Sequence, residues 1–293
     1  MEPTLVEIKQ DRPGFDRFIG SWLCKNDKTI VIDVGPSRSA AKLIDALSVL
    51  GIHRVDRVLL THIHMDHAGG LAEFLDHFPT ARAVCHSKAI PHLVDPSRLW
   101  QGSLKTLGDL AGAYGPIRPV ERSRLIPHSE AREQGVDIIE TPGHAPHHLS
   151  FILQGNLFAG EAGGIYLAGK GWEYLRPATP PVFFLKEFLQ SIDRLLTAKD
   201  LPICYAHFGR AQSSHCMLNR EKAQLLLWES LIKEETANGD RGAMERCMAR
   251  LLREDPELKA FEGMCAVDQD REKFFVANSI KGYLGFLQEN PNP

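Results

Sequence analysis

Three histidines and one aspartate fall within six positions of one segment, Thr61-His62-Ile63-His64-Met65-Asp66-His67-Ala68-Gly69-Gly70. Residues i and i+2 of an extended chain project to the same side, so His62 and His64 can reach one point. Asp66 and His67 enter the following turn and can face a neighbouring point. Imidazole and carboxylate groups are the ligands that Zn²⁺-like ions select, so we predict a metal site here. A pair of exposed histidines on an edge strand would explain only part of this set.

The residues on either side of this segment alternate between strand-like and helix-like patterns. An apolar run over 55–60 predicts a buried strand before the segment, and helical spacing predicts a helix over 71–78 after it. Further elements are expected on both sides, namely strands at 5–8, 29–34 and 81–85 and a helix over 39–50. This order of strands and helices predicts an α/β layered fold.

The middle of the chain is less regular. Residues 86–128 contain one predicted helix, around 97–110, and an irregular stretch of this length is often a binding loop. Three short strands, at 136–140, 149–153 and 156–159, are separated by turn residues and predict an antiparallel meander.

The last third changes from strands to helices. Residues 172–181 are predicted to form a proline-rich loop, followed by a helix over 184–196 and a strand at 203–205. From about Asn219 the pattern is charged and helical, with helices around 225–232, 243–252 and 271–287 and a break near Asn238-Gly239. We therefore divide the chain into an α/β domain over 1–215 and a helical extension over 216–293.

Three further positions carry candidate metal ligands. His144 follows a Pro-Gly turn, Glu161 stands between Gly160 and Ala162 after a predicted strand, and His207 follows the strand at 203–205. His144 can complete a set of three histidines with His62 and His64. An acid between glycines after a strand is unusual unless a cation is close to it.

Three neighbouring residues have weaker signals. His148 is expected to fix loop geometry through a hydrogen bond, whereas His147 is expected to be exposed. Cys204 is expected to be an inward-facing strand cysteine in preference to a metal ligand. The six cysteines contain no C-x-x-C pair and are predicted to be reduced thiols, mostly buried.

Composition excludes several classes of protein. The 293 residues are 43% hydrophobic and 24% charged, which is typical of a globular protein and not of a disordered or fibrous one. The formal net charge is −3, without the basic excess expected of a nucleic-acid binder. No apolar run approaches the ~18 residues that a membrane span needs, and no signal-peptide core is present, so a cytoplasmic protein is expected.

In order along the chain, these motifs resemble the metallo-β-lactamase superfamily. The resemblance rests on HxHxDH at 62–67, the Pro-Gly-His ending at His144, the Gly-acid-Ala around Glu161 and the late strand-end His207. It covers residues 1 to about 215 and implies a four-layer αββα sandwich, with two sheets inside and helices outside. Two divalent metal ions are implied at one rim, with Zn the first expectation and Fe or Mn as alternatives.

The resemblance also implies roles for individual residues. The first ion would be held by His62, His64 and His144, and the second by Asp66, His67 and His207. Glu161 stands where the family usually has a bridging Asp, so whether it bridges the two ions is left open. Asp33 resembles the aspartate that lies beneath the site in the family.

The activity implied is hydrolysis by hydroxide bound to two metal ions, with Asp66 orienting the nucleophile or carrying its proton. We expect a small ester-like substrate, with a thioester favoured because thioesterases of this fold carry C-terminal helices. The alternatives are a lactonase or phosphodiesterase of the same fold, and a non-catalytic or regulatory metal-binding protein. A small molecule is the expected partner, with no nucleic acid and no membrane, and a homodimer is left open.

Overall fold

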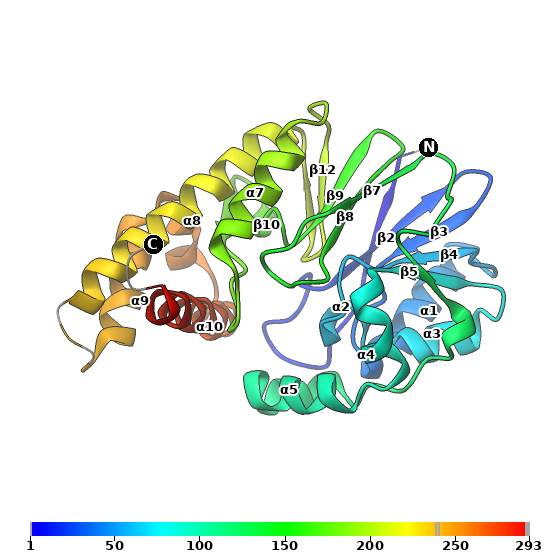
Figure 1. Ribbon diagram of the computed structural model, residues 1–293, viewed down its shortest axis with the longest axis horizontal. Coiled ribbons are helices and arrows are strands. Elements are labelled where there is room, and N and C mark those ends of the chain that lie inside the picture. Colours follow the sequence, from blue (N-terminus) through cyan, green and yellow to red (C-terminus); the bar gives the residue numbers. More distant parts are fainter. Residues whose placement is uncertain (1, 238, 240, 291–293) are drawn as a thin grey trace.

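Two mixed β-sheets form the centre of the molecule, and helices cover their outer faces (Figure 1). The computed structural model describes residues 2–237, 239 and 241–290. The first sheet has six strands in the order β1 (Thr4–Glu7), β2 (Gly20–Lys25), β3 (Thr29–Ile32), β4 (Arg57–Leu59), β5 (Arg82–Cys85) and β6 (Leu125–Pro127). Its first three strands are antiparallel, and β3 to β6 are parallel.

The second sheet holds the predicted meander and the late strand. Its order is β13 (Gly209–Ala211), β12 (Ile203–Tyr205), β9 (Asn156–Gly160), β8 (Leu149–Leu153) and β7 (Val136–Glu140). β7, β8 and β9 are antiparallel, whereas β12 runs parallel to β9. The carboxyl ends of β9 and β12 therefore lie at the same edge.

The inner faces of the two sheets share one apolar core. Trp22 of β2 packs edge-to-face on Phe158 of β9, with ring centroids 5.9 Å apart. The indole N–H of Trp22 donates to the carbonyl oxygen of Tyr205 at 2.9 Å, which also links the sheets. Cys204 lies in this core, where burial raises the pKa of its thiol. It is an inward-facing strand residue, as predicted.

Helices complete the outer layers and the C-terminal extension. Beside the first sheet lie α1 (Ala40–Val49), α2 (Met65–Ala68), α3 (Leu71–His77) and α4 (Ile90–Val94). They are followed by α5 (Ser97–Leu107), which lies beyond α4, and by α6 (Asp109–Tyr114), which packs on α5. α7 (Leu185–Leu196) covers the second sheet, and the extension consists of α8 (Ser214–Ala237), α9 (Ala243–Glu254) and α10 (Ala266–Glu289). The predicted α/β sandwich with C-terminal helices is confirmed. Among the described residues, no helix combines the length and apolarity needed to cross a bilayer.

Several predicted elements were wrong or incomplete. β2 was missed because it is buried on both faces: Trp22 and Cys24 face the second sheet, whereas Leu23 joins the core beneath the helices. Such a strand lacks the alternation of polar and apolar residues that marks a half-buried one.

The predicted proline-rich loop over 172–181 was also wrong in its first half. Trp172–Arg176 is strand β11, which pairs with β10 (Ile165–Gly169) in a two-stranded hairpin. The prolines begin only at Pro177 and leave the strand free to pair. The helix expected around 97–110 ends at Leu107, and α8 begins at Ser214, earlier than expected. The predicted break at Asn238 lies outside the described residues.

Candidate metal centre

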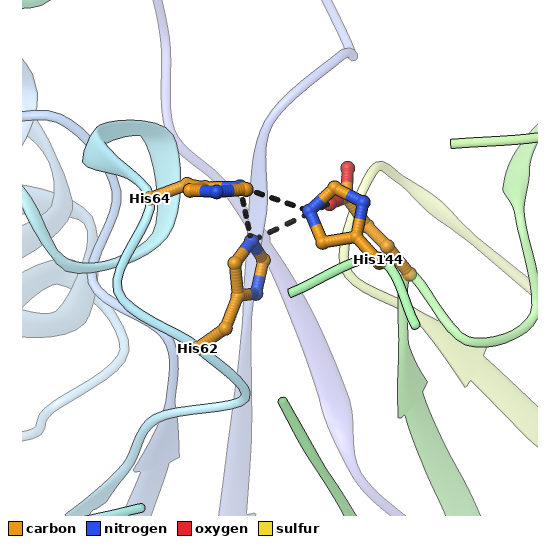
Figure 2. Close-up of side chains that lie close together, drawn as sticks. His62, His64 and His144 are labelled. Carbon is orange, nitrogen blue, oxygen red and sulfur yellow. Dashed lines mark hydrogen bonds and ion pairs between the residues drawn. The ribbon is translucent and has the colours of Figure 1, made fainter. Parts of the chain in front are cut away.

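Each candidate ligand follows a strand or lies in a loop between strands. His62 and His64 come after β4, Glu161 after β9 and His207 after β12, whereas His144 lies between β7 and β8. These ends meet at one rim of the sandwich, so residues far apart in sequence come together. Figure 2 shows the rings of His62, His64 and His144 converging on one point.

The first group of ligands consists of His62, His64, His144 and Glu161. Nδ1 of His64 lies 3.0 Å from Nε2 of His62 and 2.9 Å from Nε2 of His144. Oε2 of Glu161 lies 2.5 Å from Nε2 of His144 and 3.4 Å from Nε2 of His62. Ligand atoms around one tetrahedral ion, bonded at about 2.0–2.1 Å, are about 3.3 Å apart. The four atoms are therefore spaced closely enough to surround one ion.

Hydrogen bonds to Nδ1 of His62 and His144 orient these two rings so that the lone pair on each Nε2 faces the centre of the first group. The Thr61 hydroxyl donates to Asp33 at 2.7 Å, so it accepts a hydrogen from Nδ1 of His62 at 3.0 Å. Nδ1 of His144 donates to the carbonyl oxygen of Ala178 at 2.8 Å. Nε2 of His62 and Nε2 of His144 are thus free of hydrogen in the neutral rings. The Glu161 carboxylate faces the same lone pairs and is repelled by them. A cation bound between these atoms would remove that repulsion.

The second group consists of Asp66, His67 and His207. Oδ2 of Asp66 lies 3.5 Å from Nε2 of His207 and 3.8 Å from Nε2 of His67. Asp33, buried beneath the site, accepts from Nδ1 of His67 at 3.0 Å and leaves Nε2 facing the group. Within the described part of the chain, Nε2 of His67 has no hydrogen-bond partner although it is buried. The carboxylate oxygen and the two imidazole nitrogens of this second group also suit a divalent ion.

Glu161 lies between the two groups. Its Oε2 belongs to the first group, and its Oε1 lies 2.9 Å from Nε2 of His207 and 3.9 Å from Nε2 of His67. Burial opposes ionisation of this carboxyl, yet the neighbouring imidazoles of His144, His207 and His62, which take up protons when no metal is bound, hold its pKa well below the usual range. Glu161 is therefore an ionised carboxylate with one oxygen toward each group.

The turn that carries Glu161 is fixed by His148. Nε2 of His148 accepts the backbone N–H of Glu161 at 3.0 Å, and Nδ1 of the same ring faces the hydroxyl of Thr141 at 2.8 Å. Gly160 has a φ of +56°, and a Cβ there would lie 2.5 Å from Nε2 of His148. Only glycine permits this approach. His148 thus holds the loop, as expected from the sequence.

The two groups differ in their affinity for protons. Burial lowers the pKa of His64 to about 4. Burial also opposes the charged form of His67, but Asp66, Asp33 and Glu161 raise its pKa to about 9. At neutral pH and without metal, His67 therefore carries an extra proton that His64 lacks.

This difference predicts a pH dependence of metal binding. An ion that binds Nε2 of His67 must displace its proton, so affinity at the second group should rise about tenfold per pH unit from pH 6 to 8. His64 requires no such release in this range. Calorimetric titration of metal-free protein in buffers of different ionisation enthalpy should show about one proton released when an ion binds the second group. Two binding events with identical pH dependence would contradict the assignment.

A third group of possible ligands, His86, His128 and Glu140, lies outside the rim. Nδ1 of His86 accepts the backbone N–H of Lys88 at 3.0 Å, and Nδ1 of His128 accepts that of Ser87 at 3.1 Å. Each neutral ring therefore carries its hydrogen on Nε2, where His128 donates to Glu140 at 2.9 Å. These nitrogens offer no lone pair, so the group is a hydrogen-bonded cluster and not a metal site.

A cavity of about 320 Å³ opens above the ligands. Its floor includes His64, Asp66, His144, Glu161 and His207. Its walls come from distant parts of the chain and are mainly apolar, with Leu99 and Leu107 of α5, Ile165 of β10, the loop Ala178–Val182, and Phe275 of α10. Asn278, on α10, also lines this cavity and is largely buried.

His147 is not exposed as predicted, and part of the cavity wall was not predicted. The ring of His147 is half-buried, with its centroid 6.4 Å from that of His62, and its Nδ1 is buried. Packing of the loop 145–147 against the rim prevents the simple exposure that was expected. Tyr114 and Asn278 also line the cavity and carried no motif that identified them.

Comparisons with known proteins agree with this geometry. Residues 19–207 match the family model described as the metallo-beta-lactamase superfamily. A metallo-beta-lactamase fold-containing protein of Sulfurisphaera tokodaii is 30% identical over 219 residues, covering 69% of this chain and 79% of the relative. A crystal structure of an archaeal metallo-beta-lactamase superfamily protein from Sulfolobus tokodaii aligns with a TM-score of 0.68 at 22% identity, over 97% and 98% of the two chains.

A relative with a named substrate is more distant. The hydroxyacylglutathione hydrolase of Aeromonas hydrophila is 27% identical over 161 residues, or 54% of this chain. The chain spans about half the length of that enzyme.

Proposed function

This chain belongs to the metallo-β-lactamase superfamily and is a metal-dependent hydrolase, and we propose that it uses two divalent ions to cleave a small ester-like substrate, with a thioester preferred. The observation that carries the proposal is the arrangement of lone pairs at the rim. Two groups of buried donor atoms share Glu161, which offers one oxygen to each. A single ion in the first group would leave Nε2 of His67 buried and without a partner among the described residues.

The chemistry follows from the position of the ligands on the cavity floor. Divalent ions held there lower the pKa of a coordinated water toward about 7 and polarise a substrate oxygen. Asp66 lines the cavity and also faces the second group. Its carboxylate is thus placed to orient the attacking water and to accept its proton. His62, His64 and His144 would hold the first ion, and Asp66, His67 and His207 would hold the second.

The substrate preference rests on the cavity and on one relative. The apolar walls suit an acyl group, and about 320 Å³ accommodates a small molecule. Hydroxyacylglutathione, named in the Aeromonas hydrophila relative, is an acyl thioester. A thiol leaving group has a pKa of ~8.5, so it departs as a thiolate without assistance from a strong acid.

A panel of substrates tests the proposed function. The purified protein, with its metal content measured, is assayed on nitrophenyl esters, acyl thioesters, a lactone and a phosphodiester. We expect the largest kcat/KM on a thioester. Preference for the lactone or the phosphodiester would replace the proposed substrate class. No turnover of any member by a fully metal-loaded protein would favour a non-catalytic metal-binding role.

Substitution of Glu161 tests the proposed bridge. Glu161→Gln keeps the shape of the side chain but removes its charge, so the second ion should bind ~10-fold or more weakly, with the first ion mostly retained. Metal analysis after dialysis at a series of free-metal concentrations measures the affinity for each of the two ions. Glu262→Gln, at an exposed position, is the matched control. Retention of both ions at wild-type affinity would contradict a bridging role.

We propose that the helical extension over 216–293 determines substrate choice and does not hold metal. Its described residues supply no candidate ligand, but Phe275 and Asn278 of α10 line the cavity. The hydroxyl of Ser279 donates to the carbonyl oxygen of Pro177 at 3.2 Å, which joins α10 to the loop that carries Ala178. The extension therefore forms one wall of the cavity and supports the loop behind His144.

Substitution of Asn278, a polar residue of this wall, gives a direct test of this role. Asn278→Ala should raise KM for the preferred substrate by about 10-fold, the scale of one hydrogen bond, while the metal content is unchanged. Lys281→Ala, exposed on the same helix, should leave KM unaltered. Equal KM values for all panel substrates in wild type and Asn278→Ala would argue against the proposed role.

A further inference from the structure

Tyr114 lines the cavity beside the metal ligands but belongs to neither group. It is the last residue of α6, and its side chain is only 2% exposed. Its hydroxyl group is buried and makes no hydrogen bond to any described residue. Buried hydroxyl groups in folded proteins nearly always have a partner, and this orphaned hydroxyl belongs to a residue that lines the cavity, so a bound ligand can supply the missing partner.

The backbone of Tyr114 is firmly held. Its carbonyl oxygen accepts a hydrogen bond from the hydroxyl of Ser37 at 3.1 Å. The next residue, Gly115, has a φ of +93°, and a Cβ there would lie 2.6 Å from that same hydroxyl oxygen. The ring of Tyr114 meets that of Phe15 edge-on, with centroids 6.4 Å apart. These contacts fix the ring, so its hydroxyl does not need to be ordered when substrate binds.

The surroundings of the phenol favour its neutral form. Burial, with the nearby carboxylates of Asp66 and Glu161, raises the pKa of Tyr114 well above its usual value, although Arg12 and Arg271 act in the opposite sense. A phenol that retains its hydrogen across the neutral range is a permanent hydrogen-bond donor. It is a poor source of protons.

We propose that Tyr114 is a catalytic residue whose hydroxyl donates a hydrogen bond to the substrate carbonyl oxygen as negative charge develops there. This role rests on the proposed hydrolysis of an acyl substrate. The oxygen of water bonds to the carbonyl carbon, and the carbonyl electron pair moves onto its oxygen beside the phenol. When that pair returns, the bond to the leaving group breaks. The proton from water passes through Asp66 to the leaving group or to solvent, and Tyr114 keeps its own hydrogen.

Tyr114→Phe removes only the hydroxyl and tests this role. A hydrogen bond to developing charge should be worth about 10- to 100-fold in kcat, with KM and metal content unchanged. The loss should be the same for esters whose leaving groups differ widely in pKa. A loss of kcat that grows with leaving-group pKa would make Tyr114 a proton donor and would overturn the proposal. An unchanged kcat, or a loss of bound metal, would also overturn it.

Binding of an anionic analogue provides a readout independent of turnover. Ethyl methylphosphonate presents a charged tetrahedral centre, and calorimetry should show its affinity for metal-loaded Tyr114→Phe reduced by about the same factor as kcat. The proposed function fails if the wild-type protein cleaves no substrate of the panel. Equal affinity of wild type and Tyr114→Phe for the phosphonate would overturn the role of Tyr114, whatever the outcome of the substrate panel. Tyr205→Phe, which removes another buried hydroxyl without a partner, outside the cavity, should match wild type in both measurements.

Discussion

Removal of metal by a strong chelator should reduce hydrolysis of the preferred substrate by more than ~10³-fold, because unassisted water has a pKa of 15.7 and the ions lower it toward about 7. The chain's own residues cannot replace this effect. Two groups of donors face the cavity with lone pairs or carboxylate oxygens. A different nucleophile, such as a serine activated by a histidine, was not identified in the sequence.

The chelated protein should remain folded. The two sheets and their helices bury an extensive apolar core that does not include the metal ligands. Circular dichroism should therefore be unchanged while activity is lost, and addition of Zn²⁺, Mn²⁺ or Fe²⁺ should restore it. Full activity in protein shown by elemental analysis to be metal-free would exclude a metal-dependent hydrolase.

Asp66→Asn should lower kcat by about 10²-fold or more, the scale of a positioned acid–base group. The substitution preserves shape but cannot accept a proton from the attacking water. Oδ2 of Asp66 lies 3.5 Å from Nε2 of His207, so the second ion should also bind more weakly. The first ion should remain because His62, His64 and His144 are untouched.

Controls separate these two effects of Asp66. Activity is measured at saturating metal, where weaker binding of the second ion no longer limits the rate. Asp45→Asn, at an exposed position of α1, should behave as wild type. Wild-type kcat in Asp66→Asn at saturating metal would exclude Asp66 as the group that orients water or accepts its proton.

Much of the candidate site could be predicted because its residues lie in short continuous motifs at strand ends. The strand before His62 and the strand before His207 each show an apolar run that ends at the histidine. In the structure the ends of β4 and β12 meet at one rim, so motifs 145 positions apart face each other. The resemblance to a known family then supplied the grouping of the ligands.

The walls of the cavity could not be predicted in the same way. Tyr114 and Asn278 come from helices whose local sequence carries no sign of a site, and they reach the cavity only through tertiary packing. The hairpin of β10 and β11 was missed because prolines after Arg176 suggested a loop. Local patterns contain no information about which distant elements pack together.

The position of Glu161 depended on a turn that sequence alone could not resolve. A glutamate is one methylene longer than the aspartate that the family usually has, so the bridge was left open. In the structure, Gly160 adopts a positive φ against His148, and the carboxylate of Glu161 lies between the two groups. The glycine before the acid thus lets the ring of His148 approach and accept the backbone N–H of Glu161.

Anomalous X-ray diffraction from crystals of the metal-loaded protein tests the proposed two-ion centre most directly. We predict two anomalous peaks, one among His62, His64 and His144 and the other among Asp66, His67 and His207. Each ion should lie about 2.0–2.2 Å from one oxygen of Glu161. A single peak in fully loaded protein, or Glu161 oxygens more than ~3 Å from either ion, would contradict the proposed centre.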